Sequence, residues 1–125
     1  MNPLPPYAQL LRLRVDDSAD ELRLVMPFHE DVIGRPGYLH GGAIAGLLEF
    51  AAFMTLARAI GDPAVSMKPI TVTVDYMRGG TPRDTFATAE IQRLGNRIAN
   101  VEAIAWQTQR SNLIASARLN FLLER

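Results

Sequence analysis

The residues with the clearest chemical potential are His40, Gly41 and Gly42, followed by a single carboxylate at Glu49. Two glycines let the backbone approach a ligand closely, and the start of a helix presents free amide N–H groups with a partial positive charge. Such a helix start can polarise a carbonyl oxygen. Glu49 comes eight residues after Gly41, which is roughly two helical turns. A carboxylate in this place can act as a nucleophile or as a general base.

Each of these residues also fits an ordinary structural role. Glu49 is the only charged side chain between His40 and Arg58, yet it could reach solvent or pair with an arginine. His40 could be a helix-capping or loop histidine, and the glycines could form a tight turn. Their coincidence at one helix start favours chemistry, because an isolated carboxylate on an apolar helix is costly to bury without a partner or a task. His29 has no such neighbours and is predicted to be structural.

The helix that carries Glu49 is predicted over 42–60, a run rich in strong helix formers that is closed by Gly61 and then Pro63. It is apolar nearly all round, which in a soluble protein means that other elements wrap it. Its most apolar part, 43–57, is shorter than the roughly 20 residues that a membrane span needs. We therefore expect a buried helix enclosed by a sheet.

Strands are predicted on both sides of this helix. Alternating apolar and polar residues predict two strands before it and four after it, over 11–15, 22–26, 70–77, 85–94, 98–107 and 112–123. Residues 29–39 hold Gly34, Pro36 and Gly37 and show no sustained period, so they are predicted to form an irregular connection of the kind that often lines sites. Residues 1–7 lack the pattern of a signal peptide and are expected to be a mobile lead-in.

Composition narrows the class of protein. A chain of 125 residues, 48% of them hydrophobic, suits a single domain over 1–125 with a real core. Thirteen basic residues balance thirteen acidic ones, so no broad field attracts nucleic acid or an anionic membrane. The chain has no cysteine and only two isolated histidines, which disfavours a metal site. We expect no metal, no cofactor, no nucleic-acid or membrane partner, and a cytoplasmic location.

The run from Tyr38 to Ala52 resembles the signature of the hotdog-fold acyl-CoA thioesterases of the phenylacetate-degradation and 4-hydroxybenzoyl-CoA thioesterase group. In that family a His-Gly-Gly motif is followed at this spacing by Asp or Glu. The similarity extends over nearly the whole chain: residues 74–78 resemble a strand ending in Asn-Tyr-Leu-Arg, and residues 93–97 resemble a hairpin that often meets coenzyme A. The resemblance implies an α+β hotdog fold, in which a curved antiparallel sheet of about six strands wraps a long central helix.

The resemblance also implies an activity, the hydrolysis of a medium-chain acyl-CoA or aroyl-CoA thioester to the free acid and coenzyme A. The Gly41 amide would donate a hydrogen bond to the thioester carbonyl, with Gly42 beside it in the binding site. Glu49 would attack the carbonyl or activate water, and His40 would orient the thioester or assist the leaving thiolate. Active sites in this fold lie between subunits. A homodimer is therefore expected, with dimers pairing into a tetramer, and Glu49 would serve a substrate bound chiefly against the other subunit's Gly41.

Further residues are candidates for contacts with the substrate. Guanidinium groups suit phosphate oxygens, so the candidates for the coenzyme A phosphates are Arg78, Arg93 and Arg97, although each also fits ordinary solvation at a strand end or turn. The helix segment 50–54 and the loop 33–39 are expected to line the acyl pocket. Thr71 and Thr73 are expected on the polar face of the strand that borders this pocket, where a hydroxyl could hold the attacking water, although an ordinary β-forming role is also open.

One position departs from the family's pattern. Active relatives commonly carry Asn or Gln six residues before the motif histidine, as a second donor to the carbonyl oxygen, and this chain has Gly34 there. Losing one such donor typically costs about 10²–10³ in rate. Arg35 or the loop backbone could replace it, or the enzyme could be slow. The alternative is a non-catalytic hotdog protein that binds acyl-CoA. An enoyl-CoA hydratase fits poorly, because the Asp followed five residues later by His is missing.

Overall fold

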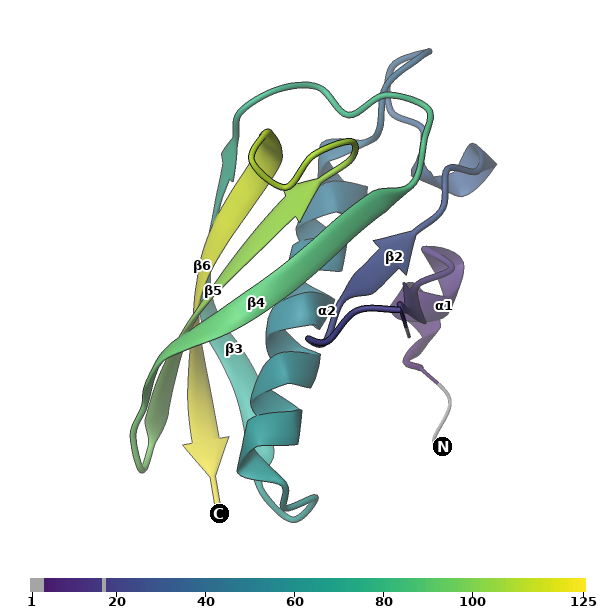
Figure 1. Cartoon of the computed structure of the whole chain (residues 1–125). Helices are drawn as coiled ribbons and strands as arrows, with labels where there is room; N and C mark the ends of the chain where they lie inside the picture. Colours follow the sequence, from purple (N-terminus) through teal and green to yellow (C-terminus); the bar gives the residue numbers. More distant parts are fainter. Residues whose placement is uncertain (1–3, 17) are drawn as a thin grey trace.

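The fold is a six-stranded antiparallel sheet curved around one long helix (Figure 1). A computed structural model describes residues 4–16 and 18–125. Strands β1 (Arg14–Val15) and β2 (Leu24–Met26) precede helix α2 (Gly41–Ile60), and four strands follow it: β3 (Ser66–Tyr76), β4 (Thr85–Leu94), β5 (Ile98–Trp106) and β6 (Leu113–Glu124). The strand order is β1-β2-β4-β5-β6-β3. The predicted order of two strands, one long helix and four strands is confirmed, although β1 is shorter than predicted and β3 begins earlier.

Helix α2 begins and ends at residues suited to those positions. His40 is the N-cap, and its ring nitrogen Nδ1 accepts a hydrogen bond from the Gly42 N–H at 2.8 Å. Gly61 follows the last residue with a φ of 68°, a left-handed conformation that glycine adopts at little cost. By length and hydropathy α2 would also suit a membrane span, but here it packs against β2, β3, β4, β5 and β6.

Small side chains let the sheet approach α2 closely. The inward-facing positions near the start of the helix are largely alanine, and they are buried: Ala87, Ala103, Ala105, Ala115 and Ala117. Larger inward residues, Leu119 and Phe121, occupy the other end of β6 and are also buried. The core is therefore shallow where α2 begins and deeper where it ends, which fixes how the helix lies across the sheet.

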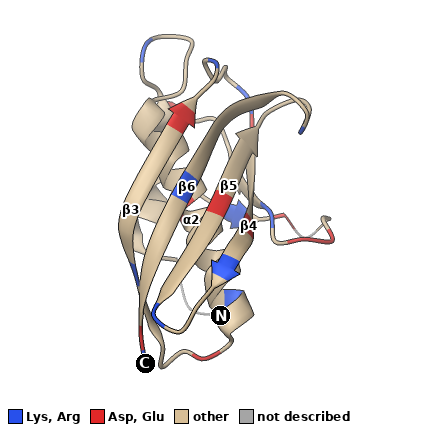
Figure 2. Cartoon of the chain, turned by 90° about the vertical axis from the view of Figure 1, so that its left-hand side faces the viewer, with Lys and Arg blue, Asp and Glu red and all other residues tan. Residues whose placement is uncertain are grey.

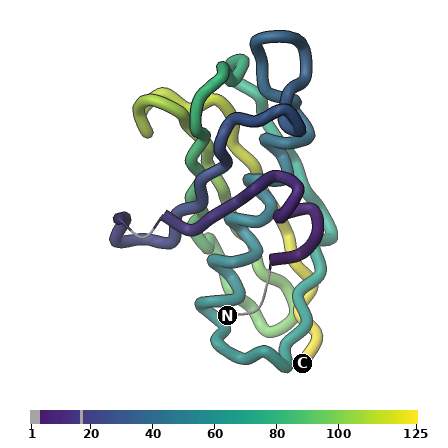
Figure 3. The backbone as a smooth tube through the Cα atoms, turned by 90° about the vertical axis from the view of Figure 1, so that its right-hand side faces the viewer, coloured from purple at the N-terminus to yellow at the C-terminus, as the bar shows by residue number. Residues whose placement is uncertain are grey.

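The N-terminal segment is more ordered than its sequence suggests. Pro6 and Tyr7 belong to helix α1 (Pro6–Leu10), which lies across α2 (Figure 3). The Tyr7 ring packs against Phe50, with ring centroids 6.4 Å apart, and a Cβ atom at Gly46 would lie only 2.8 Å from it. The predicted mobile lead-in is thus wrong for Pro6 and Tyr7, because so short a helix is stabilised by packing that local pattern does not reveal. Residues 1–3 lie outside the described part of the chain.

The connection before α2 contains two tight turns. Residues Glu30–Val32 form a short 3₁₀ helix, and Ile33 then pairs with Leu39. Between these two, the Tyr38 N–H donates to the Arg35 carbonyl at 2.9 Å, and Gly37 has a φ of 84°. With Pro36 before Gly37, this is a type II turn. The loop predicted to be irregular is therefore a small hairpin that leads directly into His40.

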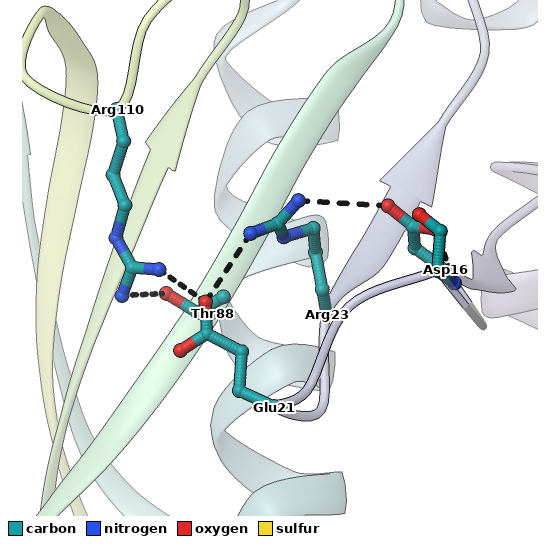
Figure 4. Close-up of polar contacts among 6 residues, drawn as sticks. Asp16, Glu21, Arg23, Thr88 and Arg110 are labelled. Carbon is teal, nitrogen blue, oxygen red and sulfur yellow. Dashed lines mark hydrogen bonds and ion pairs between the residues drawn. The ribbon is translucent and has the colours of Figure 1, made fainter.

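An ionic cluster ties the turn between β1 and β2 to the loop between β5 and β6 (Figure 4). Glu21 pairs with Arg110 and, at 3.4 Å, with Arg23, and Arg110 also donates to the Thr88 hydroxyl at 3.2 Å. The guanidinium groups of Arg110 and Arg23 both lie over the ring of Trp106, at 5.1 and 5.2 Å from its centroid respectively. Hydrogen bonding from Arg110 holds the pKa of Glu21 below its usual value.

We predict that Glu21→Gln lowers the free energy of unfolding by about 0.5–1 kcal/mol near pH 7, a modest amount because the carboxylate side chain is 41% exposed. Since the pKa of Glu21 is lowered in the folded protein, its stabilisation is present above the unfolded value of 4.5 and is lost as the pH falls through the folded value. Urea unfolding should therefore show a gap between wild type and variant near pH 7 that closes as the pH falls below 4.5 and through the lowered pKa of Glu21.

The control for this measurement is Asp20→Asn, which changes an exposed acid in the same turn that forms no ion pair with any described residue. An equal loss of stability in the control, or a gap that does not change with pH, would contradict the assignment.

Candidate functional site

The first turn of α2 carries a free backbone amide. The Gly42 N–H donates to His40 Nδ1, and the Ala43 N–H donates to the His40 carbonyl at 3.0 Å. Among residues 4–16 and 18–125, the Gly41 N–H has no hydrogen-bond acceptor. This amide lies at the positive end of a helix of 20 residues, so it is the group of this turn that can bind a carbonyl oxygen or an oxyanion.

Tyr76, the last residue of β3, holds this turn in place. Its hydroxyl donates to the Gly41 carbonyl at 2.8 Å. The peptide group that accepts this bond also presents the Gly42 N–H to His40, so Tyr76, this peptide and His40 form one chain of hydrogen bonds. No role was predicted for Tyr76, because the contact joins residues 35 positions apart in the chain.

The hydrogen bonds of His40 assign its tautomer. Because Nδ1 accepts from the Gly42 N–H, the neutral ring carries its proton on Nε2. The side chain of His40 is exposed. Its Nε2–H is therefore an exposed donor on the residue that precedes the free amide of Gly41. The capping role and a chemical role for His40 are thus compatible, because each uses a different ring nitrogen.

Glu49 lies half-buried in the middle of α2. No described residue forms a hydrogen bond or an ion pair with its carboxylate, so pairing with an arginine is excluded within that part of the chain. Eight residues separate it from Gly41, about 12 Å along the helix axis at about 1.5 Å per residue. Both groups cannot reach one carbonyl from the same chain, because catalytic contacts span about 3 Å.

The path of the loop explains the glycine at position 34. A Cβ atom there would lie 2.9 Å from the backbone Cα of His40, so a side chain would displace the N-cap of α2. The Gly34 N–H donates to the Tyr38 carbonyl at 3.0 Å, and the His40 N–H donates to the Val32 carbonyl at 2.8 Å. The guanidinium of Arg35 lies over the Tyr38 ring, 5.1 Å from its centroid. The replacements expected from the sequence, Arg35 and the loop backbone, are therefore largely engaged elsewhere.

The three candidate phosphate-binding arginines do not come together in one chain. Arg78 follows β3 at the end where α2 begins, and its Nε donates to the Leu113 carbonyl at 3.2 Å. Arg93 and Arg97 belong to the hairpin between β4 and β5, at the opposite end of the sheet (Figure 1). There the Arg97 carbonyl accepts a hydrogen bond from the Leu123 N–H. A site that uses all three arginines needs more than one subunit.

Two threonines lie away from the helix. Thr71 and Thr73 pair with Asn120 and Arg118 on the outer face of the sheet, which carries charges of both signs (Figure 2). Their predicted place on the polar face of β3 is confirmed, and this face points outward, away from α2. They line a polar hollow together with residues of β4, β5 and β6.

His29 has the structural role predicted for it. It is 8% exposed, and its Nε2 hydrogen-bonds to the Leu11 carbonyl at 3.0 Å. Over the described residues, no three His, Asp or Glu side chains gather as metal ligands. The groups available for chemistry are thus the free amide of Gly41, the Nε2–H of His40 and the carboxylate of Glu49.

Comparison with known proteins identifies the family. Residues 36–114 match the family model of the thioesterase superfamily. A Chromobacterium violaceum protein is 34% identical, with a TM-score of 0.78, and the match covers 96% of this chain and 84% of that one. A protein from the thioesterase superfamily is 28% identical, with a TM-score of 0.83, and the match covers 96% and 90%. A Bacillus halodurans protein, whose structure contains CoA, is 20% identical, with a TM-score of 0.84. That match covers 98% of this chain and 78% of the Bacillus protein. No curated protein matches the chain.

These matches confirm the predicted hotdog fold and the predicted family. The family model spans more than half of the chain and includes the motif from His40 to Glu49. The first turn of α2, with its free amide, is therefore part of the matched region. The chain belongs to the thioesterase superfamily, and it is a thioester hydrolase.

Proposed function

We propose that this chain hydrolyses acyl-CoA thioesters to the free acid and coenzyme A, using Gly41 and Glu49. The observation that carries the proposal is a free amide at the start of α2 together with an unpaired carboxylate on the same helix. The CoA in the Bacillus halodurans structure supports the choice of thiol. Arg78, Arg93 and Arg97 supply cations that suit its phosphates. The acyl group is a medium-chain acyl or aroyl group, and the location is cytoplasmic.

The steps follow from the groups present. The carbonyl oxygen of the thioester accepts the Gly41 N–H, so negative charge that develops on this oxygen faces the positive end of α2. Glu49 takes a proton from water, whose oxygen attacks the carbonyl carbon. The C–S bond then breaks, and the leaving sulfur takes that proton from Glu49, so coenzyme A departs as the thiol and Glu49 is again a carboxylate. A direct attack by Glu49 would give an anhydride that water hydrolyses to the same products.

His40 is proposed as the second donor to the carbonyl oxygen. Its Nε2–H is an exposed donor on the residue before Gly41, whereas the amide donor common in relatives is absent at Gly34. Hydrogen bonds to an oxyanion strengthen as charge develops, so this donor acts mainly on the transition state.

A homodimer would supply what one chain lacks. Within a chain, Gly41 and Glu49 are about 12 Å apart along the helix. Strand β3 is a free edge of 11 residues, and exposed apolar residues lie along and just after it, at Ile70, Val72, Tyr76 and Met77. Long apolar edges are normally covered. Two β3 edges paired about a two-fold axis would continue the sheet and bring Glu49 toward the partner subunit's Gly41. Pairing of dimers into a tetramer stays a prediction.

We expect Glu49→Gln to lower thiol release by about 10²–10⁴, the usual contribution of a general base. The measurement follows free thiol from acyl-CoA thioesters of increasing chain length and from benzoyl-CoA and phenylacetyl-CoA. The matched control is Glu102→Gln, which changes an exposed glutamate on the outer face of the sheet. A variant as fast as wild type would remove Glu49 from the mechanism. Tight binding of acyl-CoA by calorimetry without any release would instead select the non-catalytic binding protein.

The role of His40 can be separated from its capping role by His40→Asn. The asparagine side-chain oxygen can still accept the Gly42 N–H as an N-cap, but the Nε2–H is lost. We expect kcat to fall by about 10²–10³, with little change in KM or in the melting temperature. His40→Ala, which removes cap and donor together, should also lower stability by about 1 kcal/mol. An unchanged kcat in His40→Asn would rule out the donor role.

The proposed sharing of one site between two subunits can be tested with mixed dimers. Gly41→Pro removes the free N–H, and proline suits the first helical position after a residue with the extended conformation of His40, φ −69° and ψ 133°. Gly41→Pro and Glu49→Gln should each be inactive. Refolded together in equal amounts, they should recover about a quarter of wild-type activity, because half of the dimers then hold one intact site of two. If both groups act within one chain, mixing recovers nothing.

A further inference from the structure

An apolar groove of about 660 Å³ runs between the C-terminal half of α2 and the start of β3. Phe53, Ala57 and Ile60 line it from the helix, and Val65 and Met67 line it from the opposite side. The groove ends at the turn after α2, where the Asp62 carboxylate accepts a hydrogen bond from the Ala64 N–H. The long walls are therefore apolar, and among the described residues that line the groove the one charged side chain, Asp62, lies at the far end.

This groove continues the strip of α2 on which Glu49 lies. Phe53 and Ala57 follow Glu49 by four and eight residues, and Ile60 follows it by eleven. Residues at these spacings share one side of a helix. All four are half-buried, whereas the opposite side of α2 is buried against the sheet. A substrate whose carbonyl lies at Glu49 therefore has one continuous apolar path leading away from it.

We propose that this groove binds the tail of a straight aliphatic acyl chain, which makes medium and long acyl-CoA thioesters the preferred substrates over aroyl-CoA. The inference rests on the proposed thioester hydrolysis. Along the helix, Phe53 lies about 6 Å beyond Glu49 and the groove ends about 18 Å beyond it. An extended chain advances about 1.2 Å per bond, so about five carbons reach the groove and on the order of twelve occupy most of it. A benzoyl ring stops short of Phe53.

The proposed dimer is consistent with this path. Met67, near the start of β3, forms one wall of the groove, and Tyr76 at the other end of β3 holds Gly41. The far end of the groove lies at the start of β3. The two β3 edges must therefore pair nearer their Tyr76 ends, so that the partner subunit's Gly41 lies toward Glu49, where the carbonyl is polarised, and not toward Asp62. Asp62 at the far end disfavours acyl chains that end in a carboxylate.

The test compares kcat/KM for straight-chain acyl-CoA thioesters from butanoyl to hexadecanoyl. Wild type should gain up to about fourfold per methylene once the chain enters the groove, because each buried methylene adds transfer free energy. Ala57→Leu partly fills the groove, so the ratio of dodecanoyl to butanoyl activity should fall at least about tenfold. The matched control is Ala59→Leu, the same change at an exposed position of α2, which should keep the wild-type ratio.

A second variant, Ile60→Trp, narrows only the far end and should lower hexadecanoyl activity while octanoyl activity stays near wild type. Three results would contradict binding of the acyl tail in the groove while leaving thioester hydrolysis intact. They are activity that does not depend on chain length, a preference for benzoyl-CoA, and a wild-type ratio of dodecanoyl to butanoyl activity in Ala57→Leu. No hydrolysis of any thioester by wild type would instead remove the proposed function itself.

Discussion

Helix α2 is apolar on nearly every side, and one sheet can cover only one side of a helix. The sheet buries the side that carries Leu47, Leu48 and Ala51, and α1 packs over Gly46 and Phe50. In the most apolar 18-residue window of α2, 39% of the residues are buried. A strip through Glu49 and Phe53 is left half-buried. The hydrophobic effect therefore requires a further cover on this strip, and a partner subunit and an apolar substrate chain both meet that requirement.

The geometry of the first turn of α2 depends on contacts from several distant segments. Tyr76 of β3 holds the Gly41 carbonyl, the Val32 carbonyl accepts the His40 N–H, and the Tyr7 hydroxyl donates to the Gly42 carbonyl at 3.4 Å. The peptide that carries the Gly41 N–H lies between these held groups, and its own carbonyl, that of His40, accepts the Ala43 N–H at 3.0 Å. Preorganised donors of this sort stabilise developing charge without reorganisation during the reaction. A Cβ atom at Gly42 would lie 3.0 Å from the His40 ring, and Gly34 shows a similar constraint from the other side of His40, where a Cβ atom would lie 2.9 Å from the His40 Cα.

Local pattern was enough to predict the elements of the fold, because strands and helices repeat with different periods. It was also enough to place Glu49 two turns into the helix that His40 caps. It failed for α1, whose five residues depend on packing against Gly46. The contact between Tyr76 and Gly41 could not be predicted either, since only the folded sheet brings the end of β3 to the start of α2. The type II turn could have been predicted from the sequence, because Pro36 and Gly37 are the residues that such a turn favours.

The position of Glu49 sets two requirements against each other. Covering its strip removes apolar area of residues such as Phe53 and Ile60 from water, at about 25 cal/mol per Å², which favours association. The same cover removes water from a carboxylate that has no partner among the described residues, which opposes association. A cover that leaves room for one water molecule at Glu49 satisfies both requirements. That retained water would then be the hydrogen-bond partner of the carboxylate and, next to a thioester carbon, the attacking nucleophile.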